Sequence, residues 1–196
     1  MSRISANKHV MAGLVLLLGL FCCSCRQPVQ PVAADYELAV AWAELTTSIT
    51  QTTPSNSPTF ASRAFGYIGL TMYESIVQGT GSHVSVATQL NGLGPLAAPE
   101  PGLSYSWPLA LNAGQAEILR LLYIQTGDAN KKRVDSLEWA MLARYRSAWK
   151  DEAVVNRSIA YGKRIAQEVF EWSKSDGGHR GFLGMDRLRA LCSPVL

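Results

Sequence analysis

The chain has 196 residues, of which 47% are hydrophobic and 17% are charged. This length and apolar content suffice for one folded domain with a sizeable core, and they exclude a largely disordered chain. The net charge is only +3, and no segment interleaves Lys or Arg with aromatic side chains, so nucleic acid is excluded as a partner.

The first 25 residues have the layout of an export signal. Two basic residues precede an apolar run, which is shorter than the roughly 20 residues that span a bilayer. Cysteines follow at positions 22, 23 and 25. Cys25 comes directly after the small Ser24, so it resembles the lipid-attachment cysteine of a bacterial lipoprotein more closely than Cys22 or Cys23 does.

Residues 26–34 form a polar linker punctuated by proline, of the kind that tethers an anchored domain. We therefore expect an exported protein that is held at the cell-envelope membrane by a lipid on Cys25. In the alternative interpretation the cysteines belong to the apolar run, and a soluble-protein peptidase removes the signal. Beyond Cys25 the only cysteine is Cys192, which predicts neither a disulfide framework nor a cysteine-based metal site.

From residue 35 onward the pattern is helical, and no segment shows sustained period-two alternation. We therefore predict an all-α bundle of about five helices. The first helix covers 35–51 and begins at the capping residue Asp35. Its inward face is made of residues at spacings of three and four: Leu38, Trp42, Leu45 and Ile49.

The second predicted helix covers 55–77, with Ser57 at the cap and Pro58 at the first helical position. Apolar residues surround it almost completely, so we expect it to be central and buried on most sides. Arg63 and Glu74 are its only charges. We interpret them as structural ties, and the alternative is that they reach toward a polar site.

Residues 79–107 are rich in Gly, Ser and Pro, which predicts a long surface loop of potential functional importance. Three further helices are predicted. They cover 106–127, which stops at Gly127; 128–150, which is capped by Asp128; and 151–178, which starts at Asp151 and leaves through Gly177 and Gly178.

The histidines do not form a catalytic pattern. His9 lies in the export signal, His83 in the long loop, and His179 after the Gly-Gly pair, and we interpret each as lacking a catalytic role. The sequence contains no phosphate-binding loop, no HExxH and no GxSxG. The residues therefore predict no catalytic, cofactor-binding or metal-binding position.

Four carboxylates lie near basic residues on the predicted helices. We interpret them as members of solvated salt bridges rather than as acid–base pairs. They are Glu37, Glu44, Asp135 and Glu138.

Three strings carry a family resemblance: SPTFASRAFGYIGLTMYESIV from residue 57, SYSWPLALNAGQAEILRLLY from 104 and RSIAYGKRIAQEVFEWSKSDGG from 157. In order and spacing they resemble helices near the start of bacterial vanadium-dependent haloperoxidase-like proteins of the type 2 phosphatidic acid phosphatase (PAP2) superfamily. The resemblance covers about residues 35–179. It implies that residues 35–178 are the non-catalytic, N-terminal helical half of such a domain, an incomplete half of a larger α-helical unit.

The resemblance also implies what this chain lacks. In the family a Lys followed by Arg-Pro, a Ser-Gly-His and an Arg with a His beyond it hold vanadate or phosphate. The sequence has no Arg-Pro and no Ser-Gly-His. Vanadate is therefore expected as a cofactor of the full-length family but has no site here. We expect the chain to be inactive alone, with a missing C-terminal half or an unknown protein as partner.

Residues 179–196 depart from the family pattern and contain closely spaced arginines and Cys192. One interpretation is an out-of-frame tail, and the other is a genuine short terminal helix. A second hypothesis for the whole chain belongs to another functional class. It is a self-sufficient helical surface lipoprotein that binds a partner through residues 79–107.

Overall fold

The computed structural model describes residues 36–175 and residue 179, and these contain helices but no strand. The five α-helices are α2 (Tyr36–Thr52), α3 (Pro58–Glu74), α4 (Trp107–Leu122), α5 (Asp128–Arg146) and α6 (Glu152–Ser175). Two short 3-10 helices, η2 (Val77–Gly79) and η3 (Ala87–Gln89), lie between α3 and α4. The predicted all-α bundle of about five helices is confirmed. None of the described helices has the length and hydropathy needed to cross a bilayer.

Several predictions fall outside the described residues. They concern the export signal at 1–25 with Cys25, the linker at 26–34, the cap Asp35, the exit at Gly177 and Gly178, and all of the tail at 179–196 except His179.

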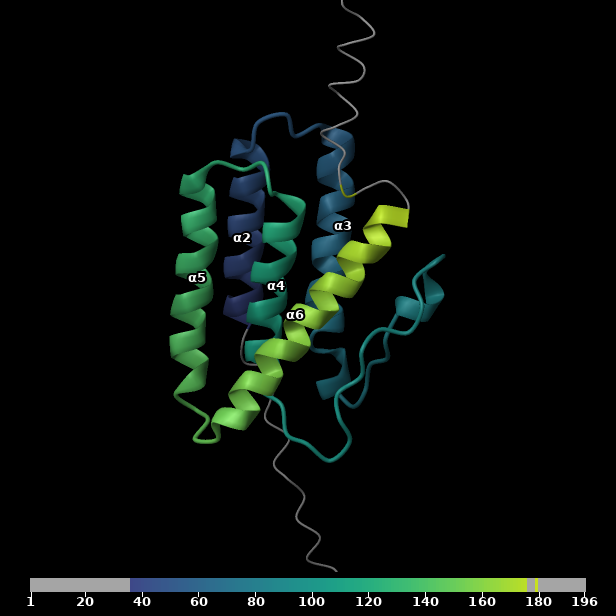
Figure 1. Cartoon of the computed structure of the whole chain (residues 1–196), viewed down its shortest axis with the longest axis vertical. Coiled ribbons are helices and arrows are strands. Elements are labelled where there is room, and N and C mark those ends of the chain that lie inside the picture. Colours follow the sequence, from purple (N-terminus) through teal and green to yellow (C-terminus); the bar gives the residue numbers. More distant parts are fainter. Residues whose placement is uncertain (1–35, 176–178, 180–196) are drawn as a thin grey trace, which may run out of the picture. The chain divides into compact units, whose positions relative to one another are not determined.

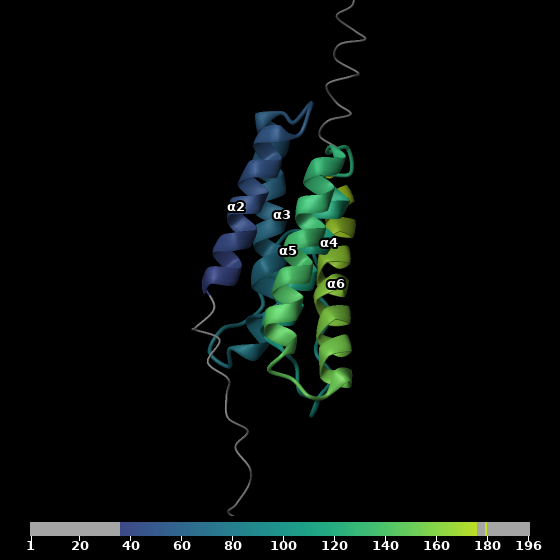
Figure 2. The same ribbon diagram turned by 90° about the vertical axis from the view of Figure 1, so that its left-hand side faces the viewer.

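The central helix of the bundle is α4, which contacts each of the other four helices. In Figure 1, α6 crosses in front of α4 at an oblique angle, and Figure 2 shows α2 and α3 on the opposite side of α4 from α6. The sequence of α4 explains its place, because four small residues let neighbours approach it closely. These buried residues are Ala110, Ala113, Gly114 and Ala116.

The prediction that the second helix is central and buried on most sides is wrong. Helix α3 buries one face, which includes Phe60, Ala64 and Tyr67, whereas Phe65 and Gly66 are exposed. Apolar residues all round a helix permit burial on every side. However, α3 has α4 and α6 as its main helical neighbours, and neither covers its outer face.

The crossing of α4 and α6 requires glycine. A Cβ placed on Gly162 would lie 1.9 Å from the carbonyl oxygen of Ala110, which is far inside van der Waals contact. A Cβ on Gly114 would lie 3.1 Å from the carbonyl oxygen of Gly162. The two backbones therefore touch at a point where no larger side chain fits.

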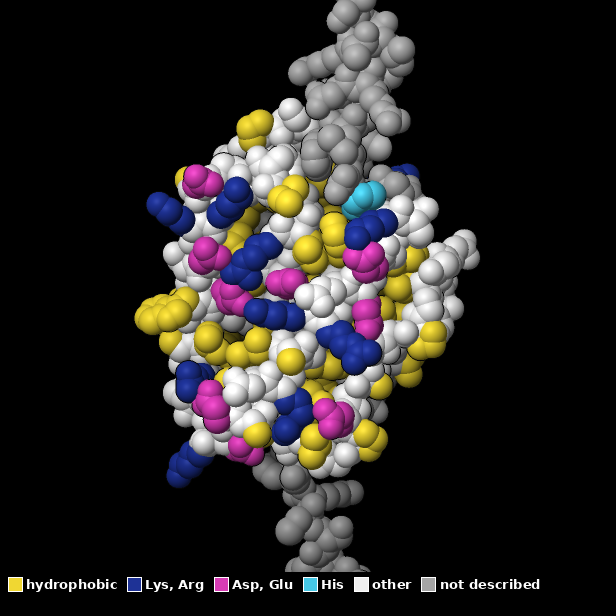
Figure 3. Space-filling model, viewed as in Figure 1, with side chains coloured by type: hydrophobic (Ala, Val, Ile, Leu, Met, Phe, Trp, Pro, Cys, Tyr) yellow, Lys and Arg dark blue, Asp and Glu magenta, His cyan; other side chains and the backbone are white. Residues whose placement is uncertain are grey.

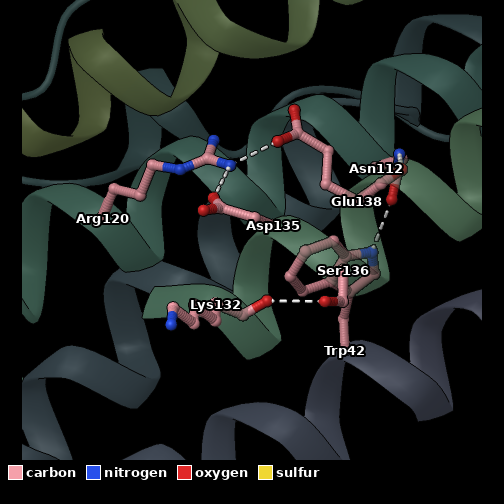
Figure 4. Close-up of polar contacts among 7 residues, drawn as sticks. All are labelled: Trp42, Asn112, Arg120, Lys132, Asp135, Ser136 and Glu138. Atoms are coloured by element: carbon pink, nitrogen blue, oxygen red, sulfur yellow. Dashed lines mark hydrogen bonds and ion pairs between the residues drawn. The ribbon is translucent and has the colours of Figure 1, made fainter. Parts of the chain in front are cut away.

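A buried polar chain links α2, α4 and α5 (Figure 4). The indole nitrogen of Trp42 donates to Asn112 Oδ1 at 3.0 Å, and Asn112 Nδ2 donates to the carbonyl oxygen of Glu138 at 2.9 Å. Trp42 is fully buried together with Leu38 and Ile49, and Leu45 is buried as well, as predicted. The predicted inward face of the first helix is thus confirmed.

The predicted caps are partly confirmed. Ser57 caps α3 by accepting the backbone N–H of Phe60 at 3.2 Å. Asp151 accepts the backbone N–H of Ala153 at 2.9 Å at the start of α6. Gly127 does not stop the third predicted helix, because α4 already ends at Leu122 and Gly127 is the residue that precedes α5.

Asp128 is the first residue of α5 rather than its cap. The carbonyl oxygen of Gly127 accepts the backbone N–H groups of Asn130 and Lys131, so the turn between the helices starts α5 through its backbone. Helix α5 also ends at Arg146, earlier than the predicted residue 150.

Candidate functional site

The histidines occupy two separate surroundings. His83 is exposed, and its Nδ1 lies 2.9 Å from the hydroxyl of the adjacent Ser82. The His179 ring packs edge-on against Phe170, with ring centroids 6.0 Å apart. Within residues 36–175 and 179, no three His, Cys, Asp or Glu side chains gather in a way that would hold a metal ion.

The predicted salt bridges are present for three of the four carboxylates. Arg120 donates to Asp135 at 2.7 Å and also to Glu138, so one guanidinium joins two carboxylates of α5 (Figure 4). Burial lowers the pKa of Arg120, but its hydrogen bonds to Glu138 and Asp135 outweigh this, and its pKa lies above the ordinary value. Glu37 pairs with Arg144 at 3.0 Å, and Glu44 is exposed.

These ion pairs belong to a surface on which both signs of charge mix. Figure 3 shows Lys and Arg side chains interspersed with Asp and Glu over the face that α4, α5 and α6 present. Side chains in such pairs are engaged with each other and are solvated, which is a structural role. The site must therefore be sought elsewhere.

Glu74 has the structural role that the sequence analysis favoured. Its side chain is buried, and Oε1 accepts the backbone N–H of Val86 at 2.9 Å. Glu74 thus ties the segment between α3 and α4 back onto the helix. Arg63 is exposed at the outer face of α3.

The segment between α3 and α4, residues 79–106, is here called the connecting segment. A second glutamate holds its other half: Glu168 Oε2 accepts the backbone N–H of Ala97 at 2.7 Å, and Oε1 accepts Arg164 Nε at 3.0 Å. The sequence analysis did not single out Glu168. Its position four residues after Arg164 predicts an ion pair within the helix. It does not predict the hydrogen bond to the backbone N–H of Ala97.

The first half of the connecting segment forms one wall of an apolar groove of about 520 Å³. Hydrogen bonds from Trp172 Nε1 to the carbonyl oxygen of Asn91 (3.1 Å) and from the Tyr73 hydroxyl to that of Val84 (2.8 Å) hold its aromatic walls. The groove is lined by residues of α3, by the two residues that flank η3 and by the end of α6: Arg63, Gly66, Tyr67, Leu70, Tyr73, Val86, Leu90 and Trp172.

The second half of the connecting segment forms, with α6, a pocket of about 390 Å³ that we call the arginine pocket. Its functional groups come from Tyr105 and Glu100 on the segment and from Arg157, Tyr161 and Arg164 on α6. Burial, and to a smaller extent the charge of the nearby Glu74, raises the pKa of Tyr161 to about 12. The Tyr161 hydroxyl therefore stays protonated over the physiological range.

We compared the chain with protein families, curated proteins and solved structures. No family model matches the chain, and no curated protein matches it. Among solved structures, the chain matches the crystal structure described as that of the first bacterial vanadium-dependent iodoperoxidase, with 25% sequence identity and a TM-score of 0.58. The match covers 71% of this chain and 32% of that one. The fold is haloperoxidase-like.

The chain thus spans about a third of the length of the iodoperoxidase that it matches. An oxyanion site of the vanadate type needs several fixed cationic donors that converge on one point. In the described part of this haloperoxidase-like fold, Arg120, Arg144 and Arg146 each pair with a carboxylate. Arg157 and Arg164 share a pocket, and no histidine is among its lining residues.

Proposed function

We propose that this chain is the N-terminal helical half of a vanadium-haloperoxidase-like protein and that it is inactive as an enzyme by itself. The observation that carries the proposal is the structural match, which takes in most of this chain but only 32% of the iodoperoxidase. The absence of Arg-Pro and Ser-Gly-His from the sequence supports it, because the oxyanion site of the related proteins uses these motifs.

The chemistry of the complete protein is either halide oxidation by peroxide with vanadate or phosphate-ester hydrolysis of the PAP2 type. Both reactions need one cationic oxyanion site. In this proposal the missing half carries that site, and the helices described here support it.

The apolar groove supports the proposal because it is the kind of surface that a missing half would cover. A groove of about 520 Å³ lined mainly by Tyr, Trp, Leu and Val is unusual on a free domain, where large exposed apolar patches mark interaction sites. In the proposal its occupant is an apolar helix of the missing half.

The direct test is to add vanadate, peroxide and iodide or bromide to the purified chain and to follow halide oxidation by absorbance. We expect no rate above that of the mixture without protein. Appreciable halide oxidation that depends on the chain and on vanadate would overturn the claim that it is inactive alone.

We also propose that the chain is exported and anchored by a lipid on Cys25, since this residue follows an apolar run and a small serine. Expression of the Cys25→Ala variant should move the protein from the membrane fraction to the soluble one. Cys22→Ala is the matched control and should stay in the membrane fraction. Equal behaviour of the two variants would refute attachment at Cys25.

A self-sufficient binding module is the second candidate, and one observation favours it. The described helices close a common core in which the largest side chains, including Trp42, Phe60, Leu109 and Ile165, are fully buried. Cooperative unfolding of a monodisperse monomer that does not bind a hydrophobic dye would favour this module. Dye binding and self-association would favour the half-domain.

A further inference from the structure

The arginine pocket has features that the proposed function does not use. Arg157 and Arg164 lie seven residues apart on α6, two turns along one face of the helix, and both line the pocket. Tyr161 lines it between them. The connecting segment closes the opposite side, where Glu168 holds Ala97 and Ser158 accepts the backbone N–H of Ser106 at 2.8 Å.

Arg157 is held in place by groups that do not neutralise its charge. Its Nε and one terminal nitrogen donate to the carbonyl oxygen of Ser104 at 3.3 and 2.8 Å. Its guanidinium carbon lies 5.2 Å from the centre of the Tyr105 ring, within the range of a cation–π contact. Both partners are uncharged, so the positive charge is positioned without being cancelled.

Arg164 is anchored at its Nε, which donates to Glu168 at 3.0 Å. No hydrogen bond engages its two terminal nitrogens within residues 36–175, and the same holds for the second terminal nitrogen of Arg157. Three guanidinium N–H₂ groups are therefore left to donate to a ligand, and guanidinium donors match carboxylate and phosphate oxygens best.

Tyr105 adds a neutral donor. Its hydroxyl oxygen accepts the backbone N–H of Glu100 at 3.1 Å, which leaves its own proton free to donate. Two arginines and one glutamate, Glu100, line the pocket. Glu168 pairs with Arg164, whereas the contacts of Arg157 within residues 36–175 are to uncharged groups, so Arg157 supplies the positive charge that no ion pair cancels. Leu103 and the alanines of the lining supply an apolar surface beside these polar groups.

From this arrangement we propose that the arginine pocket binds a small organic oxyanion, a carboxylate or phosphate ester with a short apolar body, through the guanidinium groups of Arg157 and Arg164. The apolar body lies against Leu103 and the neighbouring alanines. The volume of about 390 Å³ is in the range of small-ligand pockets. This inference does not depend on the proposed haloperoxidase relationship.

The test is calorimetric titration of the full chain with phenyl phosphate, benzoate and the neutral benzyl alcohol. We expect saturable binding of at least one of the two anions and weaker or no binding of benzyl alcohol. No saturable binding of either anion up to ~10 mM, corresponding to less than about 3 kcal/mol of affinity, would overturn the proposal. Preference for phenyl phosphate or for benzoate identifies which oxyanion the pocket takes.

Variants locate the site. Arg164→Gln removes one guanidinium from a side chain that is 69% exposed, so the fold should be preserved, and the affinity should fall about tenfold. Arg157→Gln should weaken binding at least as much. The matched control is Arg146→Gln, which makes the same charge change in an exposed ion pair with Glu152. A loss of affinity in the control equal to that of Arg164→Gln would show nonspecific attraction and overturn the assignment.

Discussion

The two halves of the connecting segment are held in the same way but build opposite surfaces. In the first half a glutamate of α3, Glu74, accepts the backbone N–H of Val86, and in the second a glutamate of α6, Glu168, accepts that of Ala97. The first half forms one wall of the apolar groove, and the second half forms one wall of the arginine pocket.

The difference arises from the helix opposite each half. On α3, Tyr67, Leu70 and Tyr73 line the groove, whereas on α6, Arg157 and Arg164 line the arginine pocket. The segment itself supplies mostly small and apolar residues on both sides. A loop of nearly uniform composition can thus form two kinds of site, because the helical partner sets the chemistry.

The largest loss of stability is expected from a substitution that displaces α6, because α6 contributes to both the apolar groove and the arginine pocket. Gly162→Ala places a Cβ 1.9 Å from the carbonyl oxygen of Ala110, so α4 and α6 must separate. We expect a loss of about 3 kcal/mol or more in the free energy of unfolding, measured by urea denaturation.

The matched control for this change is Gly69→Ala on the outer face of α3, where a Cβ meets nothing within 4 Å. This substitution should stabilise the chain by up to ~1 kcal/mol, because alanine is the better helix former. Similar losses in both variants would contradict the close α4–α6 contact.

The next effect separates the two halves. Glu74 is only 2% exposed, so Glu74→Ala leaves the backbone N–H of Val86 without its acceptor at a buried position. We expect the free energy of unfolding to fall by about 1–3 kcal/mol. Glu168→Ala should cost less than ~1 kcal/mol, since its side chain is 30% exposed and water can replace it. Thermal unfolding of both variants measures the difference, and an equal cost would show that burial does not distinguish the two ties.

A pH effect follows from Tyr161, which lies next to Glu74 and lines the arginine pocket. Its pKa is about 12 in the folded chain and about 10 in an unfolded one. Its contribution to stability is therefore complete below pH 10 and is lost as the pH rises from 10 toward 12. Burial also raises the pKa of Tyr123, which acts in the same direction.

Urea denaturation between pH 9 and 12 tests this, with Tyr161→Phe as the comparison. The variant should lose less stability over that interval than the unaltered chain does. The stability difference at pH 7 serves as the baseline for the lost hydroxyl. A parallel decline in both proteins would show that Tyr161 does not carry the effect.

The smallest change in stability is expected from a substitution in the apolar groove, and it tests whether the groove and the arginine pocket bind ligands independently. Leu70→Gln places a polar side chain in the wall of the apolar groove, at a half-buried position, and should cost about 1 kcal/mol or less. It should abolish binding of a hydrophobic dye and leave phenyl phosphate binding unchanged. Loss of both binding activities would show that the two pockets are not independent.

Local patterns in the sequence determined much of the fold. The spacing of Leu38, Trp42, Leu45 and Ile49 identified the buried face of α2, and Ser57 followed by Pro58 identified the start of α3, because both features act within one helical turn or a few turns. The carboxylates in salt bridges were likewise recognised from their basic neighbours. The ends of helices depend on more distant contacts. Gly127 is predicted to end the third helix, but in the structure it precedes α5.

The sequence by itself thus determined the helical class, most of the helices and the structural role of Glu74. Only the tertiary structure decided that α4 rather than α3 is central, that Glu168 holds the connecting segment, and that Arg157 and Arg164 share a pocket. The reason is physical. A hydrophobic pattern specifies which faces can be buried, but the close approach at Gly162 and the course of residues 79–106 decide which faces are covered and which remain open as pockets.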